Sequence, residues 1–249
     1  MLHSLESFIH LRYLELGGAS TPDHISHSIH TLQKLEVLKF KNFKNMFELP
    51  KHLSRLQNLR HLVFEDCNPL YSLFPNIGKL SCLRTLSVFF VRREEGHSLT
   101  ELRDLKLGGK LSINGLDNVS SFSEAREANL MSKKDLQELC LSWDRSFITS
   151  VESREQHIRA KQVIEGLQPH SNLKRFIIHL YDGLSLPSWI RILSSLIYVE
   201  LSGCDNCVQL SALSKLPSLK KIYISEMSNL QYMDDDEPRP GMKVRVSHL

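Results

Sequence analysis

Residues 59–70 read LRHLVFEDCNPL, and the stretch is open to two interpretations. Its apolar residues have the spacing L-x-x-L-x-L, which ends in the alternation of a half-buried strand. It also brings a histidine, two acidic residues and a cysteine close together, the residue types of a nucleophile with its base. A strand frame of a repeat protein recurs along the chain, whereas a catalytic site occurs once. The number of copies of the spacing therefore distinguishes the two interpretations.

The same spacing recurs along most of the chain. The first four copies begin 24 residues apart, at Leu11, Leu35, Leu59 and Leu83, and a degenerate copy has Gly108 at its first apolar position. The predicted strand frames lie near residues 11–16, 35–40, 59–64, 83–88, 110–114, 136–141, 173–178, 196–201 and 219–224. Periods of about 20–29 residues with this frame are typical of leucine-rich repeats, in which each repeat contributes one strand and a returning segment.

We therefore predict an α/β repeat fold, a leucine-rich-repeat solenoid or horseshoe that forms a single domain over residues 1–249. About nine short strands are expected in a concave parallel sheet, with loops, 3-10 turns and short helices on the convex side.

Two segments of the convex side have helical patterns. Ser153 and Gln156 form a capping-box pattern ahead of apolar residues at helical spacing, so an inserted helix is predicted over Glu155–Gln168. Ser121 and Glu124 similarly begin a helix through about Ser132. Residues 234–249 are expected to be a frayed tail, and because neither end has a dedicated polar cap, we expect frayed ends or self-association.

Composition excludes several classes of protein. The 31 basic and 28 acidic residues are interspersed, without the basic stripe of a nucleic-acid-binding protein. No run of about 18 apolar residues predicts a membrane span, and no signal peptide is recognisable. Five cysteines, an odd number, fit reduced thiols in the cytoplasm better than a disulfide framework.

The reactive residue types are better explained by structure than by chemistry. Cys67 and Cys204 each lie three residues after the last apolar position of a frame, where a thiol packs inward as a small hydrophobe. His61 and Glu65 alternate with buried positions and are expected on the surface. Cys204 and Cys207 lack the second cysteine pair of a zinc site. We predict a non-enzymatic protein with no catalytic residue, cofactor or metal.

Two further polar groups are expected to face solvent. His24, His27 and His30 spread over the side of a helix opposite its apolar residues, and the acidic run Asp234–Glu237 lacks the alternating ligands of a calcium loop.

Binding is expected on the concave face, where the third, fifth and seventh positions of each frame project. Aromatic residues and arginine often dominate binding energy at protein interfaces. The candidate protein-binding residues are Tyr13, Lys39, His61, Glu65, Phe89, Arg175, Ile177, His179, Tyr198 and Tyr223. The alternative, that several of them only tile a solvated sheet, is equally open at this stage.

The wording of the repeats adds a resemblance. In order along the chain stand LPKHLSRLQNLRHL, FPNIGKLSCLRTLSVFFV, LGGKLSINGLDNV, EAREANLMSKKDLQELCLSWD, VIEGLQPHSNLKRF, LPSWI and CDNCVQLSALSKLPSLKKIYI. Together they resemble the leucine-rich-repeat region of plant coiled-coil nucleotide-binding disease-resistance proteins (NB-LRR proteins), over Leu11–Met233. The nucleotide-binding module has no counterpart here, and Leu210-Ser-Ala-Leu213 departs from the family's L-P-x-L-G wording.

The resemblance implies a cytoplasmic recognition arm of an immune receptor, acting in defence. Its partners would be a pathogen effector or a guarded host protein, and the receptor's nucleotide-binding module in cis or in trans. No nucleic-acid or membrane partner is expected. The alternative is a stand-alone leucine-rich-repeat adaptor, or a truncated receptor fragment, that binds a protein partner.

Overall fold

The computed structural model describes residues 7–18, 29–43, 49, 51–67, 73–144, 153–227, 229 and 243–247. They belong to two compact units, Met1–Leu111 (unit 1) and Ser112–Leu249 (unit 2). A single continuous domain therefore stays a prediction, and the expected helix of His24–His30 lies largely outside the described residues.

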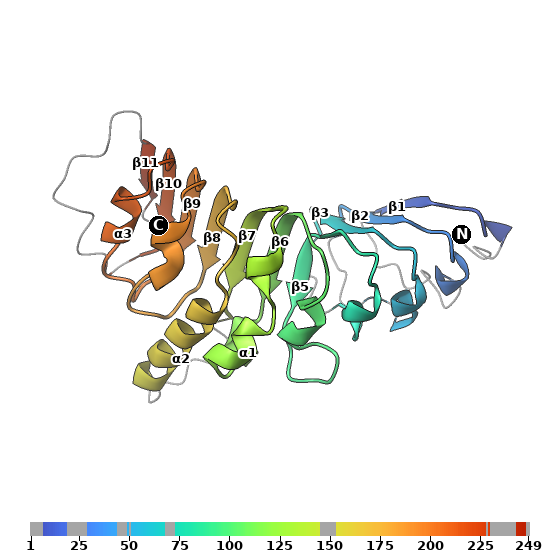
Figure 1. The fold of residues 1–249 in the computed structure, drawn as a ribbon, viewed down its shortest axis with the longest axis horizontal. Helices are drawn as coiled ribbons and strands as arrows, with labels where there is room; N and C mark the ends of the chain where they lie inside the picture. The colour runs from blue at the N-terminus through green and yellow to red at the C-terminus, as the bar shows by residue number, and fades with distance from the viewer. Residues whose placement is uncertain are drawn as a thin grey trace. The chain divides into compact units, whose positions relative to one another are not determined.

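Unit 1 contains a parallel sheet in which each strand pairs with the next along the chain. Its strands are β1 (Tyr13–Gly17), β2 (Val37–Lys41), β3 (His61–Glu65) and β4 (Thr85–Leu86). The next strand in sequence, β5 (Val88–Phe90), is not part of this sheet. The segments that return between strands carry the 3-10 turns η2 (Ile29–Thr31), η3 (Lys51–Arg55), η4 (Ile77–Lys79) and η5 (Leu99–Leu102). Figure 1 shows these turns on the side of unit 1 away from β1 to β3.

Unit 2 repeats the arrangement with more helix. Its strands, again adjacent in chain order, are β6 (Gly109–Asn114), β7 (Leu136–Ser142), β8 (Arg175–His179), β9 (Tyr198–Ser202), β10 (Lys221–Ser225) and β11 (Lys243–Ser247). All pairs from β7 to β11 are parallel. The returns contain η6 (Leu116–Asn118), α1 (Phe122–Arg126), η7 (Leu130–Ser132), α2 (Ser153–Gly166), η8 (Ser188–Ile192) and α3 (Ser211–Ser214).

The cores of both units are columns of apolar side chains held in register. In unit 1, Leu14 pairs with Leu38, Leu38 with Leu62 and Leu62 with Leu86, each step being 24 residues. The last three of these leucines are completely buried. Parallel strands, apolar columns and short returns are the leucine-rich-repeat solenoid that the sequence predicts, so the predicted fold class is confirmed.

A left-handed residue follows several of the strands. Asn42, Asp66, Leu180, Gly203 and Glu226, each directly after a strand, have φ between 50° and 65°. This conformation turns the chain so that the next side chain enters the core, and the residues placed in this way are Phe43, Cys67, Tyr181, Cys204 and Met227. The expected inward packing of the two cysteines is confirmed, with Cys204 1% exposed and Cys67 half-buried.

The helices of unit 2 are placed by their neighbours. In Figure 1, α1 and α2 lie next to each other below β7 and β8. A Cβ atom on Gly166, the last residue of α2, would lie 2.6 Å from the carbonyl oxygen of Phe122 and 2.7 Å from the Cβ of Ala125 in α1. The indole of Trp189 donates a 2.9 Å hydrogen bond to the carbonyl of Ile164, which fastens α2 to the next return.

Both predicted helices exist with different limits. The Ser121 hydroxyl accepts the Glu124 N–H at 3.2 Å, so the expected start of α1 is correct. The helix does not reach Ser132, because Asn129 has φ 49° and separates it from η7. Helix α2 runs two residues earlier at both ends than the predicted Glu155–Gln168.

The predicted frayed tail is wrong for residues 243–247. They form β11, in which Val244 pairs with Ile222 and Val246 with Ile224 of β10. As at Gly108, the first apolar position of this repeat is a glycine, Gly241, which hides the frame in the sequence.

Candidate protein-binding surface

Each sheet has an open face, defined here as the side opposite its buried leucine columns. The third, fifth and seventh frame positions lie on it because successive side chains of a strand point to opposite sides. In unit 1 these include Tyr13, Lys39, His61 and Glu65. In unit 2 they include Arg175, Ile177, His179, Tyr198 and Tyr223.

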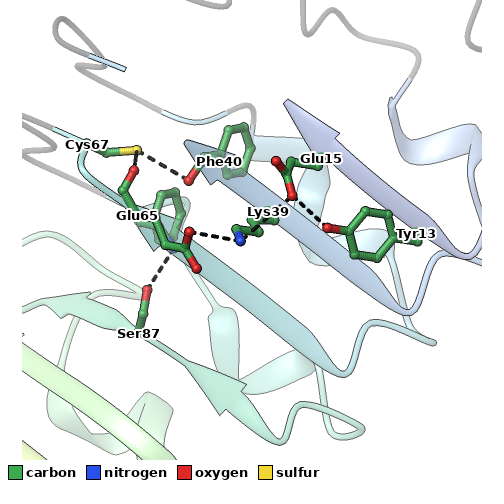
Figure 2. A network of polar contacts seen from close by, with 8 residues as sticks. Tyr13, Glu15, Lys39, Phe40, Glu65, Cys67 and Ser87 are labelled. Carbon is green, nitrogen blue, oxygen red and sulfur yellow. Dashed lines mark hydrogen bonds and ion pairs between the residues drawn. The ribbon is translucent and has the colours of Figure 1, made fainter. Parts of the chain in front are cut away.

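The open face of unit 1 carries a connected polar network over β1, β2 and β3 (Figure 2). The Tyr13 hydroxyl donates to Glu15 at 2.7 Å, and Lys39 Nζ lies 2.8 Å from Glu65 Oε2 and 3.7 Å from Glu15 Oε2. The hydrogen bond from Tyr13 lowers the pKa of Glu15, and the bond to Glu65 raises the pKa of Lys39. Lys39 therefore lies between two carboxylates, and the three charged side chains of the network sum to a charge of −1.

No nucleophile with a base forms around Cys67. The thiol donates to the carbonyls of Phe40 at 3.5 Å and Glu65 at 3.3 Å, and burial raises its pKa. His61 Nδ1 instead lies 3.0 Å from the hydroxyl of Thr85 on the next strand. A thiol that is harder to ionise, and that contacts no imidazole of a described residue, is a packing group.

The open face of unit 2 carries a second network, which links β7, β8 and β9. Arg175 Nε lies 2.7 Å from Glu138 Oε2, although without hydrogen-bond alignment, and its guanidinium carbon is 4.0 Å from the centre of the Tyr198 ring. The Tyr198 hydroxyl donates to Glu200 at 2.6 Å. Burial, with this hydrogen bond, raises the pKa of Tyr198 to about 12. A cation held against an aromatic ring and a carboxylate is an ordered arrangement.

The other candidates in unit 2 surround this network. Ile177 is only 8% exposed and pairs in register with Cys140 and Glu200. His179 and Tyr223 are half-buried, and the Tyr223 hydroxyl lies 3.2 Å from that of Ser247. The face is therefore apolar at Ile177 and polar around it.

The expected position of Phe89 is wrong, because it is 1% exposed and belongs to the core. The strand is interrupted at Ser87, whose hydroxyl accepts the backbone N–H of Phe64 at 2.9 Å. Leu86, before this bulge, is buried as alternation predicts. After it the buried positions are Phe89 and Val91, one residue later than simple alternation predicts.

Sequence reasoning did not select the carboxylates that hold these side chains. Glu15 and Glu200 each lie two residues after a tyrosine and accept a hydrogen bond from its hydroxyl. The repeated Tyr-x-Glu wording at Tyr13 and Tyr198 was the available signal, because residues two apart share one face of a strand.

The remaining candidate chemistry is not supported. Cys204 and Cys207 are buried, and burial raises the pKa of Cys207 to about 11. Within the described ranges, no group of three or more histidine, cysteine or acidic side chains is placed to hold a metal ion. None of the helices described for this chain has the length and apolar character needed to span a bilayer.

The sequence of the chain is similar to sequences of known proteins. Two proteins of Solanum bulbocastanum with disease-resistance names, RGA1 and RGA4, are each 38% identical to the chain, over 165 and 190 residues. These matches cover 65% and 75% of this chain but only 16% and 18% of the relatives. An RPP13-like disease-resistance protein of Arabidopsis thaliana is 35% identical over 58% of the chain and 14% of its own length.

A solved leucine-rich-repeat protein of Leptospira interrogans aligns with 91% of this chain and 69% of its own, at 18% identity and a TM-score of 0.44. That likeness is too loose for an argument about function. The family model described as R13L1/DRL21 LRRs matches residues 99–227, just over half of the chain. The chain therefore belongs to the R13L1/DRL21 family of leucine-rich repeats.

Proposed function

We propose that the chain is the non-enzymatic recognition region of a plant disease-resistance receptor in the cytoplasm. It binds a pathogen effector or a guarded host protein, and it restrains the nucleotide-binding module of the receptor until that protein arrives. The chain itself supplies no catalytic group and no cofactor site in this role.

The observation that carries the proposal is the ordered cluster of Glu138, Arg175, Tyr198 and Glu200 on an open sheet face. Its side chains are already held by an ion pair, a cation–π contact and a hydrogen bond. A partner that binds there meets groups that lose little further freedom, which favours affinity. Tyrosine and arginine are also the residue types most often found at interface hot spots.

The test uses a nucleotide-binding module of this receptor family, produced separately and labelled with a fluorescent ADP. We expect the chain to bind the module and to slow the release of the nucleotide. Tyr198→Ala combined with Tyr223→Ala should weaken the binding by about tenfold or more, the range for hot-spot residues. The unfolding midpoint should change little, because both side chains lie on the open face.

The matched control is Phe122→Ala combined with Met131→Ala, which also truncates two exposed side chains, 44% and 56% exposed, away from the strands. This variant should bind as the wild type does. Equal losses in the two variants, or unchanged binding in the tyrosine variant, would contradict the assignment of the face. Failure of the wild-type chain to bind the module would contradict the restraint.

A further inference from the structure

The last two strands of unit 2 differ in charge from the other open-face strands. On the open face of unit 1, Lys39 lies between two glutamates. In unit 2, Arg175 lies against Glu138. The corresponding positions of β10 and β11 hold Lys221, Lys243 and Arg245, all exposed.

The register brings these charges together. Lys221 pairs directly with Lys243, and Tyr223 pairs with Arg245, whose guanidinium carbon lies 5.9 Å from the tyrosine ring. Neighbouring strands are about 4.8 Å apart. Like charges placed directly opposite destabilise a sheet, by roughly 0.2–1 kcal/mol. The pairing of Lys221 with Lys243 therefore does not stabilise the fold.

The three cations have no carboxylate partner among the residues that the structure describes. The nearest acidic position in register is Glu200, which lies opposite Tyr223 and accepts the hydroxyl of Tyr198. We call Lys221, Lys243, Arg245 and the intervening Tyr223 the basic face.

We propose that the basic face binds an acidic segment of a partner protein, a stretch of aspartate or glutamate residues. The inference rests on the proposed function and specifies the chemistry of the partner. Carboxylates would occupy the space between the two lysines and Arg245, and the Tyr223 ring would cover the apolar part of the segment. The binding would offset the repulsion that the empty face retains.

A protein partner fits better than a nucleic acid or an anionic membrane. Serines form a neutral row beside the cations, with Ser202 in register with Ser225 and Ser225 with Ser247. Glu200 lies at the border of the face and would repel a continuous line of phosphates. Three cations on two short strands also fall short of the six to ten phosphate contacts typical of strong nucleic-acid binding.

The experiment measures binding of a fluorescent peptide of about ten alternating Glu and Ala residues to the whole chain, by fluorescence anisotropy. The face variant is Lys221→Gln, Lys243→Gln and Arg245→Gln. The matched control is Arg55→Gln, Lys79→Gln and Lys106→Gln, which removes three exposed charges from unit 1. Both variants have the same net charge. A difference in their affinity for the peptide would therefore show that the position of the removed charges matters.

We expect the face variant to lose at least about tenfold in affinity for the peptide and the control to lose less than about twofold. The affinity of the wild type should fall between about 0.05 M and 0.2 M salt, because the charges are exposed. The thermal midpoint of the face variant should equal or exceed that of the wild type, since its like-charge pairs are gone.

Four outcomes would overturn the inference. The first is an equal loss of affinity for the peptide in both variants, and the second is no binding of the peptide by the wild type. The third is tighter binding of a single-stranded RNA, or of an anionic vesicle of matched charge, than of the peptide. The fourth is peptide binding that appears only after Asp234–Glu237 are neutralised. The last outcome would identify the chain's own acidic run as the occupant. If the chain still binds the nucleotide-binding module, the proposed function survives any of them.

Discussion

Cys207 shows how the fold controls a reactive residue type. It is completely buried, and its thiol contacts the carbonyl of Gln209 at 3.9 Å. Burial raises the pKa of this thiol to about 11 because the thiolate loses its hydration. Cys82, by contrast, is half-buried.

We expect Cys207 to react with iodoacetamide at pH 8 far more slowly than the more exposed Cys82. The thiolate is the reactive form, and a pKa raised from 9.0 to about 11 lowers the thiolate fraction of Cys207 about a hundredfold. Peptide mass spectrometry of the native chain over time measures both rates. In denaturant the two rates should converge. Comparable rates in the native chain would contradict the burial.

The same shift makes stability depend on pH with a known sign. The Cys207 thiol has a higher pKa in the folded chain than in the unfolded one. Its contribution to the free energy of unfolding is therefore complete below about pH 9. It is lost as the pH rises towards 11, by at most about 1.4 kcal/mol for each pH unit.

At the level of single residues, sequence reasoning located the exposed side chains better than their partners. Tyr13, Lys39 and Arg175 could be assigned to one face because a strand alternates. Their bonds to Glu15, Glu65 and Glu138 depend on side-chain rotamers and on distances between strands, which the sequence does not contain. The interpretation that Cys204 packs inward succeeded because its frame position is fixed by the repeat.

At the level of the element, the turn after several of the strands requires a left-handed residue, and not every residue found there suits that conformation. Asn42, Asp66 and Gly203 suit the left-handed conformation, whereas Leu180 and Glu226 adopt it at a steric cost of roughly 1–2 kcal/mol. Glu226 is exposed and makes no side-chain bond with any described residue.

Glu226→Asn should therefore raise the free energy of unfolding by about 0.5–1 kcal/mol, because asparagine tolerates the left-handed region without adding the backbone freedom of glycine. Denaturant unfolding followed by circular dichroism measures the change. The control is Ser225→Asn, one residue earlier in β10, where φ is not positive and Ser225 is nearly buried. That change should destabilise the chain. A loss of stability in Glu226→Asn would contradict the account.

Elements were predicted where the frame was regular and missed where it was interrupted. The bulge at Ser87 depends on a side-chain hydroxyl that replaces one bond of the ladder, which shifts Phe89 into the core. The repeat that contains β11 has Gly241 in place of the first leucine of the frame, so only the pairing with β10 reveals the strand.

At the level of the whole molecule, each repeat packs against its neighbours in sequence, and stability is approximately a sum of local terms. Gly166 is a suitable place to test this. An alanine there would overlap α1, whose nearest atoms lie 2.6 Å and 2.7 Å from the added carbon.

Gly166→Ala should lower the stability of unit 2 by about 1–3 kcal/mol, the usual range for overpacking. Hydrogen exchange measured by mass spectrometry should show faster exchange in β7 and β8, with β2 and β3 unchanged. Gly109→Ala is the control for a glycine whose added Cβ meets nothing within 4 Å, although its φ of 73° adds local strain. Uniformly faster exchange in Gly166→Ala would show that the chain unfolds as one cooperative body.

The constant step of 24 residues between Leu14, Leu38, Leu62 and Leu86 has a consequence for inheritance. A misaligned crossover between two copies of the coding sequence would remove or duplicate one whole step. After such a deletion Leu14 would pair with Leu62, and the apolar column would stay continuous. The set of open-face side chains would change in one generation while the scaffold beneath them stayed the same.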